Sequence, residues 1–90
     1  MNRRQKSRLR YAQTVIRWEF MRGRERISCQ VDRESERDGA GRFAVISLPY
    51  QKLQRGTIEF FENATAALRR HATMASDLRE TGWKLVGYTS

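Results

Sequence analysis

The sequence predicts an α+β fold: a two-layer sandwich in which one long amphipathic helix covers one face of a mostly antiparallel four-stranded sheet. Three observations carry this prediction. Apolar residues alternate with polar ones before residue 49, recur with helical spacing over residues 58–81, and alternate again from residue 83. The predicted order is therefore β-β-β-α-β, within a single domain of residues 14–90. At 90 residues the chain is long enough to bury a core without disulfide bonds.

The first two strands are predicted to form a hairpin that begins at Thr14. One apolar residue in two is the pattern of a strand with one buried face, and Gly23 supplies the turn between the two alternating segments. The residues expected to face the helix are Ile16, Trp18 and Phe20 in the first strand, and Ile27, Cys29 and Val31 in the second.

A third strand is predicted over residues 42–48, after a polar loop at 33–41 and before Pro49, which cannot donate to a sheet. Ala44, Ile46 and Leu48 form its more apolar face and are expected to contact the helix. Phe43 and Val45 lie on the opposite face, so both faces of this strand are apolar and both are expected to be covered.

The helix is predicted over residues 58–81, because its apolar side chains fall on one broad arc. Thr57 is the expected N-cap, and Gly82 stands where a left-handed residue usually ends a helix. A short last strand is predicted from residue 83 to 89. A right-handed crossover would place it parallel to the third strand, although it could also exchange with a second subunit.

Positive charge is concentrated at the start of the chain. The net charge is +8, and the first 26 residues hold nine Lys and Arg against two Glu. Residues 1–13 have few apolar side chains, so we expect a basic, mobile arm that precedes the domain. Clustered cations attract phosphates, which favours a nucleic-acid partner.

The leading functional prediction is a small non-enzymatic module that binds the phosphate backbone of nucleic acid. The arm supplies affinity, and the sheet face away from the helix either stacks bases on Phe43 and Tyr88 or forms a dimer. The predicted phosphate-binding residues are Arg3, Arg4, Lys6, Arg8, Arg10, Arg17, Arg26 and Lys84. The alternative is a homodimeric or protein-interaction module that uses the same sheet face, since exposed apolar patches usually mark association.

Sites for catalysis, metals and cofactors are not predicted. Cys29 and His71 are the only thiol and imidazole, and both are expected in the core instead of in a nucleophilic dyad. The acidic segment that begins at Glu34 resembles the start of a calcium loop, but its twelfth position is Val45 instead of the glutamate that such loops need. One Cys and one His are too few for zinc.

The compartment predicted from the sequence is the cytoplasm. A single cysteine cannot form an internal disulfide, which favours a reducing environment. The longest apolar run has four residues, far short of the ~20 that span a bilayer, so integral membrane association is not expected.

Overall fold

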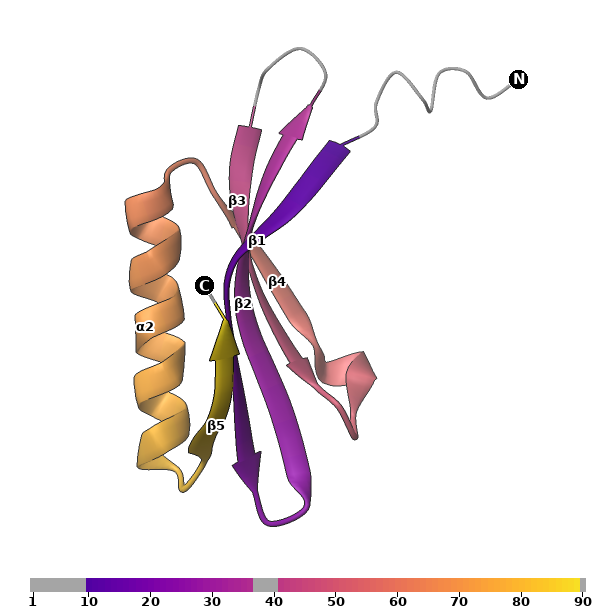
Figure 1. Cartoon of the computed structure of the whole chain (residues 1–90), viewed down its shortest axis with the longest axis vertical. Coiled ribbons are helices and arrows are strands. Elements are labelled where there is room, and N and C mark those ends of the chain that lie inside the picture. Colours follow the sequence, from indigo (N-terminus) through magenta and orange to yellow (C-terminus); the bar gives the residue numbers. More distant parts are fainter. Residues whose placement is uncertain (1–9, 37–40, 90) are drawn as a thin grey trace, which may run out of the picture.

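The computed structural model of the protein describes residues 10–36 and 41–89, and in them it shows a five-stranded sheet and one long helix (Figure 1). The strands are β1 (Arg10–Arg22), β2 (Glu25–Glu36), β3 (Gly41–Pro49), β4 (Thr57–Phe61) and β5 (Lys84–Thr89). A short 3-10 helix, η1 (Leu53–Arg55), precedes β4, and the helix α2 (Ala64–Glu80) joins β4 to β5. The α+β class with a helix packed on a sheet is confirmed.

The strand order in the sheet is β4-β3-β2-β1-β5, and every neighbouring pair is antiparallel. The predicted four-stranded β-β-β-α-β arrangement is therefore wrong, because β4 adds a strand before the helix. The last strand also differs from the expected parallel neighbour of the third strand. The helix carries the chain across the sheet, so β5 pairs with β1 on the edge opposite β4.

The extra strand β4 occupies the segment that the sequence assigned to the first turn of the helix. Phe60 and Phe61 fit the helical arc, but in the structure they pair with Ala44 and Phe43 of β3. The true N-cap is Asn63, whose side-chain oxygen accepts a hydrogen bond from the Ala66 amide at 2.9 Å. The helix therefore begins seven residues after Thr57, the predicted cap.

The two predicted glycine positions are confirmed. Gly23 has φ +62° and is the first of two residues in the tight turn between Arg22 and Glu25, as in a type II′ hairpin. Gly82 has φ +95° immediately after the helix, where the Trp83 amide donates to the Leu78 carbonyl at 3.0 Å. This hydrogen bond satisfies one of the helix's terminal carbonyl groups.

The sheet face that α2 covers, here called the helix face, holds the core. Val31 and Val45 are opposite one another in β2 and β3 and pack with Ala67 of α2 into the buried cluster. Phe20 in β1 is fully buried. Ile16, Trp18 and Phe20 lie opposite Val31, Cys29 and Ile27, so the predicted inward residues of the first hairpin are confirmed as sharing one face.

The face assignment of β3 was wrong. Val45 is fully buried in the core cluster, and Phe43 packs against that cluster together with Phe61. Ile46 and Leu48 instead lie opposite Gln30 and Ser28 on the other side of the sheet, here called the open face. Both faces of this strand are apolar, so periodicity cannot choose between them, and the register with Val31 decides.

The Asn63 cap gives the first stability prediction. Asn63→Ala is expected to lower the free energy of unfolding by about 1 kcal/mol, because the Ala66 amide loses its acceptor. Urea denaturation of the two proteins measures this difference. Asn63→Asp keeps a side-chain acceptor and is the control. Equal losses in both variants would show that the cap does not contribute in this way.

Candidate nucleic-acid interface

The predicted phosphate-binding residues occupy different parts of the chain. Arg3, Arg4, Lys6 and Arg8 lie outside the described residues, and Arg10 is the first residue of β1. The remaining cations share the open face. Arg17 lies opposite Gln30 in β2, Lys84 lies opposite Met21 in β1, and Met21 is also opposite Arg26.

Two of these cations meet in a polar cluster on the open face. A guanidinium nitrogen of Arg17 lies 2.8 Å from a Glu19 carboxylate oxygen and donates to the Tyr50 hydroxyl at 2.6 Å. The Tyr50 hydroxyl in turn donates to Glu19 at 3.2 Å. The Arg26 guanidinium lies 3.7 Å from the other Glu19 oxygen and contacts the Met21 sulfur at 3.4 Å. We call Arg17, Glu19, Arg26 and Tyr50 the arginine cluster.

The arginine cluster follows from strand geometry. Arg17 and Glu19 are two residues apart in β1 and so lie on one face, while Arg26 follows the hairpin turn on the neighbouring strand. Tyr50 comes directly after β3, and its backbone amide donates to the Arg26 carbonyl at 2.9 Å. Two guanidinium groups thus share one carboxylate, which leaves an excess of positive charge in fixed positions.

Three chain segments meet near the hairpin turn and form what we call the basic end: residues 17–26, 49–56 and 77–86. The Gln51 side chain accepts from the Arg26 amide at 3.0 Å and donates to the Arg24 carbonyl at 2.9 Å, and Arg22 donates to the Thr81 carbonyl at 3.0 Å. The basic end has eight Lys and Arg against four acidic residues. The other described residues have five of each, so the domain is electrically polarised.

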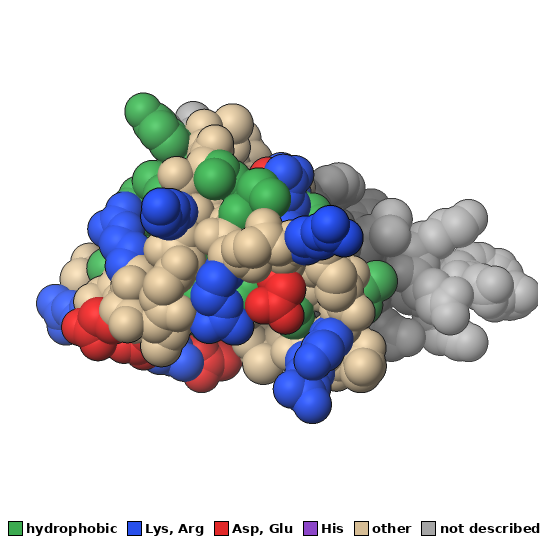
Figure 2. Space-filling view, turned by 90° about the horizontal axis from the view of Figure 1, so that it is seen from below, with side chains coloured by type: hydrophobic (Ala, Val, Ile, Leu, Met, Phe, Trp, Pro, Cys, Tyr) green, Lys and Arg blue, Asp and Glu red, His purple; other side chains and the backbone are tan. Residues whose placement is uncertain are grey.

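Several cations of the basic end are available to a ligand. Within the described part of the chain, four of them form neither an ion pair with a carboxylate nor a cation–π contact: Arg24, Lys52, Arg55 and Lys84. Figure 2 looks onto this end of the molecule and shows Lys and Arg side chains spread over it among fewer acidic ones. This arrangement suits a polyanion that contacts several cations at once.

The two aromatic residues predicted to stack bases are not on the open face. Phe43 packs against the core cluster. Tyr88 is 70% exposed, but it lies opposite Trp18 and so on the side of the sheet that Trp18 occupies. A register shift between β1 and β5 causes this, because Leu85 and Tyr88 are three residues apart whereas their partners Phe20 and Trp18 are two apart.

The arginine cluster and the rest of the basic end contain residues that the sequence did not predict for the site. Glu19 and Tyr50 fix the two guanidinium groups, and Lys52 and Arg55 come from the connection between β3 and β4. Glu19 could have been found from the alternation of the first strand, which puts Arg17 and Glu19 on one face. Tyr50 had no such signal, because only the pairing of β3 with β2 brings residue 50 to the hairpin.

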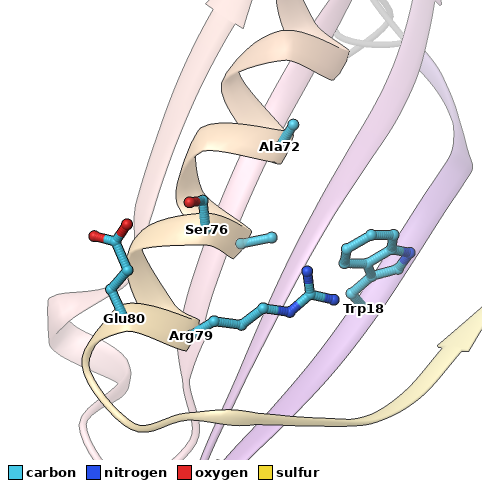
Figure 3. A pocket seen from close by; sticks show the side chains of 6 residues that line it. Trp18, Ala72, Ser76, Arg79 and Glu80 are labelled. Atoms are coloured by element: carbon cyan, nitrogen blue, oxygen red, sulfur yellow. The ribbon is translucent and has the colours of Figure 1, made fainter.

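A shallow groove lies on the other side of the sheet, between β1 and the last turns of α2. Its volume is about 350 Å³, and its lining residues are Trp18, Ala72, Ala75, Ser76, Arg79 and Glu80. In Figure 3 Arg79 extends toward the Trp18 ring while Glu80 points away. The Arg79 guanidinium lies 5.6 Å from the centre of that ring, so it already makes a cation–π contact with the groove's only aromatic side chain.

Cys29 and His71 are in contact with each other, and both lie in the core, where the sequence predicted them. His71 Nε2 lies 3.0 Å from the carbonyl oxygen of Cys29, and both residues are almost fully buried. A carbonyl oxygen only accepts, so Nε2 carries the hydrogen. Burial raises the pKa of the Cys29 thiol to about 11, against a smaller lowering by its hydrogen bond with Ser47. At neutral pH this thiol stays protonated and is a poor nucleophile.

The buried imidazole predicts a pH dependence of stability. Burial lowers the pKa of His71 from 6.5, although its hydrogen bond with the Cys29 carbonyl acts in the opposite direction. Below pH 6.5 the unfolded chain takes up a proton that the folded chain does not. The free energy of unfolding therefore decreases as the pH is lowered, by at most about 1.4 kcal/mol per pH unit. Urea midpoints at pH 7.5, 6.5 and 5.5 measure this loss.

The His71→Gln variant is the reference for that experiment, because an amide keeps a hydrogen-bond donor and does not titrate. We expect a flatter pH profile for it between pH 7.5 and 5.5. An identical drop in both proteins would assign the pH dependence to other groups.

Within the described residues, no three His, Cys, Asp or Glu side chains lie close enough to hold a metal ion. Residues 10–36 and 41–89 contain no helix that is long and apolar enough to cross a membrane. Comparisons of the chain with protein-family models, curated proteins and solved structures find no match.

Proposed function

We propose that this protein is a non-enzymatic module that binds the phosphate backbone of nucleic acid in the cytoplasm. The observation that carries the proposal is the basic end, where two arginines are held on one carboxylate and four further cations have neither an ion pair nor a cation–π contact among the described residues. Oriented guanidinium groups match phosphate oxygens well, since each presents several donors in a fixed plane.

The basic arm is the second part of the proposed interface. Residues 10–13 of the predicted arm belong to β1, so residues 1–9 are the part that precedes the sheet. They join β1 at Arg10, and the hairpin turn that bears Arg24 follows the far end of this 13-residue strand. At about 3.3 Å per residue these two points are roughly 40 Å apart. The arm and the basic end therefore contact separate phosphates of one nucleic acid. Contacts of this kind supply affinity without reading the base sequence.

Fluorescence anisotropy with labelled oligonucleotides tests the proposal, using the full chain and a variant that lacks residues 1–9. This deletion spares β1, which begins at Arg10. Loss of the four cations in that segment is expected to reduce the slope of log affinity against log salt by about 3 to 4. The truncated protein keeps weaker binding through the basic end. Lack of binding by the full chain at low salt would overturn the proposal.

Self-association is a second candidate, and the free edge of β5 favours it. Among the described strands, β5 pairs only with β1, and its residues Val86 and Tyr88 are 50% and 70% exposed. An exposed apolar edge strand can pair with a second copy. Sedimentation equilibrium of the wild type and of Val86→Lys tests this. A monomeric wild type at tens of micromolar would exclude a dimer at those concentrations.

A further inference from the structure

The aromatic side chains on the open face are already engaged. The Tyr50 hydroxyl is hydrogen-bonded to Arg17 and Glu19 within the arginine cluster. Phe60 lies opposite Ala44, and the Arg42 guanidinium sits 3.6 Å from the centre of its ring. Phe60 keeps 45% of its surface exposed, but it is a single ring with a cation over one side, so this face shows no run of exposed rings among the described residues.

The aromatic residues between Trp18 and Tyr88 that lie off the open face do not supply a stacking platform either. Phe20 is fully buried, and Phe43 and Phe61 pack against the core. The Trp83 and Trp18 rings lie under Arg22 and Arg79, at 4.6 and 5.6 Å. Tyr88 alone is mostly exposed, on the edge strand and away from the open face.

This pattern bears on the form of nucleic acid that fits. Proteins that bind single strands without sequence preference stack successive bases on exposed rings, each of which strengthens binding substantially. A duplex keeps its bases stacked on one another and presents only phosphates at regular spacing. The open face matches the second case, because its described part offers cations on rigid strands and no series of exposed rings on which successive bases could stack.

The arginine cluster adds a second, independent reason. Arg17 is held by two partners within 3 Å, and Arg26 by contacts with Glu19 and Met21, so both guanidinium groups are fixed before a ligand arrives. Fixed cations suit the fixed phosphates of a double helix. A flexible single strand would have to lose conformational freedom to reach the same positions.

We propose that the open face at the basic end is selective for double-stranded nucleic acid, which it recognises through the phosphate backbone; this inference rests on the proposed function. B-form DNA and A-form RNA share the phosphate chemistry. The higher charge density of a duplex strengthens the selectivity, because each neutralised phosphate contributes a slope of about 0.9 against about 0.7 for single strands. For about five contacts, this difference amounts to roughly tenfold at 0.1 M salt.

The test is anisotropy of the full chain with a labelled 20-bp DNA duplex, a 20-bp RNA duplex and the unstructured single strand dT20, each at 0.1 M salt. We expect at least one duplex to bind about tenfold more tightly than dT20. Equal or tighter binding of dT20 would overturn duplex selectivity and leave the proposed backbone binding intact. Lack of binding to all three would overturn both.

Tyr88→Ala tests separately for base stacking, because Tyr88, at 70%, is more exposed than Phe60 and is the ring that a single strand would reach most easily. We expect the affinities for both duplexes to stay within twofold, and any residual dT20 binding to change equally little. A loss of about fivefold or more that is confined to dT20 would show base stacking and count against the inference. Tyr50→Phe provides the complement: it frees Arg17 from one partner and is expected to weaken duplex binding several-fold while dT20 binding changes less.

Discussion

Phe20→Ala is expected to lower the free energy of unfolding by about 3 to 5 kcal/mol, the range typical of a truncated buried phenylalanine. Phe20 is the largest fully buried side chain of the domain, with none of its surface exposed. It lies on β1, opposite Ile27 on one neighbouring strand and Leu85 on the other. The cavity left by alanine would therefore open where β5 docks on the sheet.

The loss is a large share of the whole stability of a small domain, which is usually about 5 to 15 kcal/mol. Urea denaturation measures it, and the melting temperature is expected to fall by at least roughly 12 °C. Phe20→Leu, with a smaller expected loss, keeps the experiment informative if the alanine variant does not fold. Tyr88→Ala is the exposed control, expected to change stability by less than about 0.5 kcal/mol. A loss below 1 kcal/mol for Phe20→Ala would contradict the described core.

The double variant Arg17→Gln/Arg26→Gln is expected to weaken nucleic-acid binding by about 50-fold at 0.1 M salt. Two phosphate contacts account for this, since each contributes about 0.7 to 0.9 to the slope of log affinity against log salt. The salt slope itself should fall by about 1.4 to 1.8. Anisotropy titrations at three salt concentrations measure both quantities.

The matched control for the double variant is Arg69→Gln, which changes an exposed arginine of α2 away from the basic end. We expect its affinity to stay within twofold of the wild type. Urea denaturation of the double variant verifies folding, because half-exposed ion pairs contribute little to stability. Equal effects of the control and the double variant would show a response to net charge and not to the arginine cluster.

The elements with an unambiguous period could be predicted from the sequence, and the others could not. Ile16, Trp18 and Phe20 alternate with polar neighbours, so their shared face was predicted correctly. Thr57–Phe61 was assigned to the helix because Phe60 and Phe61 fit a helical arc as well as a strand. Asn63 is a better N-cap than Thr57, and it marked the true start of the helix.

The candidate site was predictable only in part, because it depends on which strands are neighbours. Arg17, Arg26 and Lys84 were among the predicted phosphate-binding residues, and the register of β1 with β2 and β5 puts them on one face of the sheet. The contacts of Tyr50 with Arg17 and Glu19 require the pairing of β3 with β2, which no local pattern encodes. Phe43 was misplaced for the same reason, since one residue of register moves a side chain to the other face.

The position of β5 also determines how the domain opens. Its partner β1 is more than sixty residues away in the chain, while β1, β2, β3 and β4 pair in chain order. Detaching β5 breaks one short ladder and leaves the other three intact, so it costs less than separating two inner strands, as does detaching β4 at the opposite edge. In that open form the 13-residue β1 becomes an unprotected edge beside Phe20. The native docking of β5 therefore guards the chain against edge-to-edge aggregation.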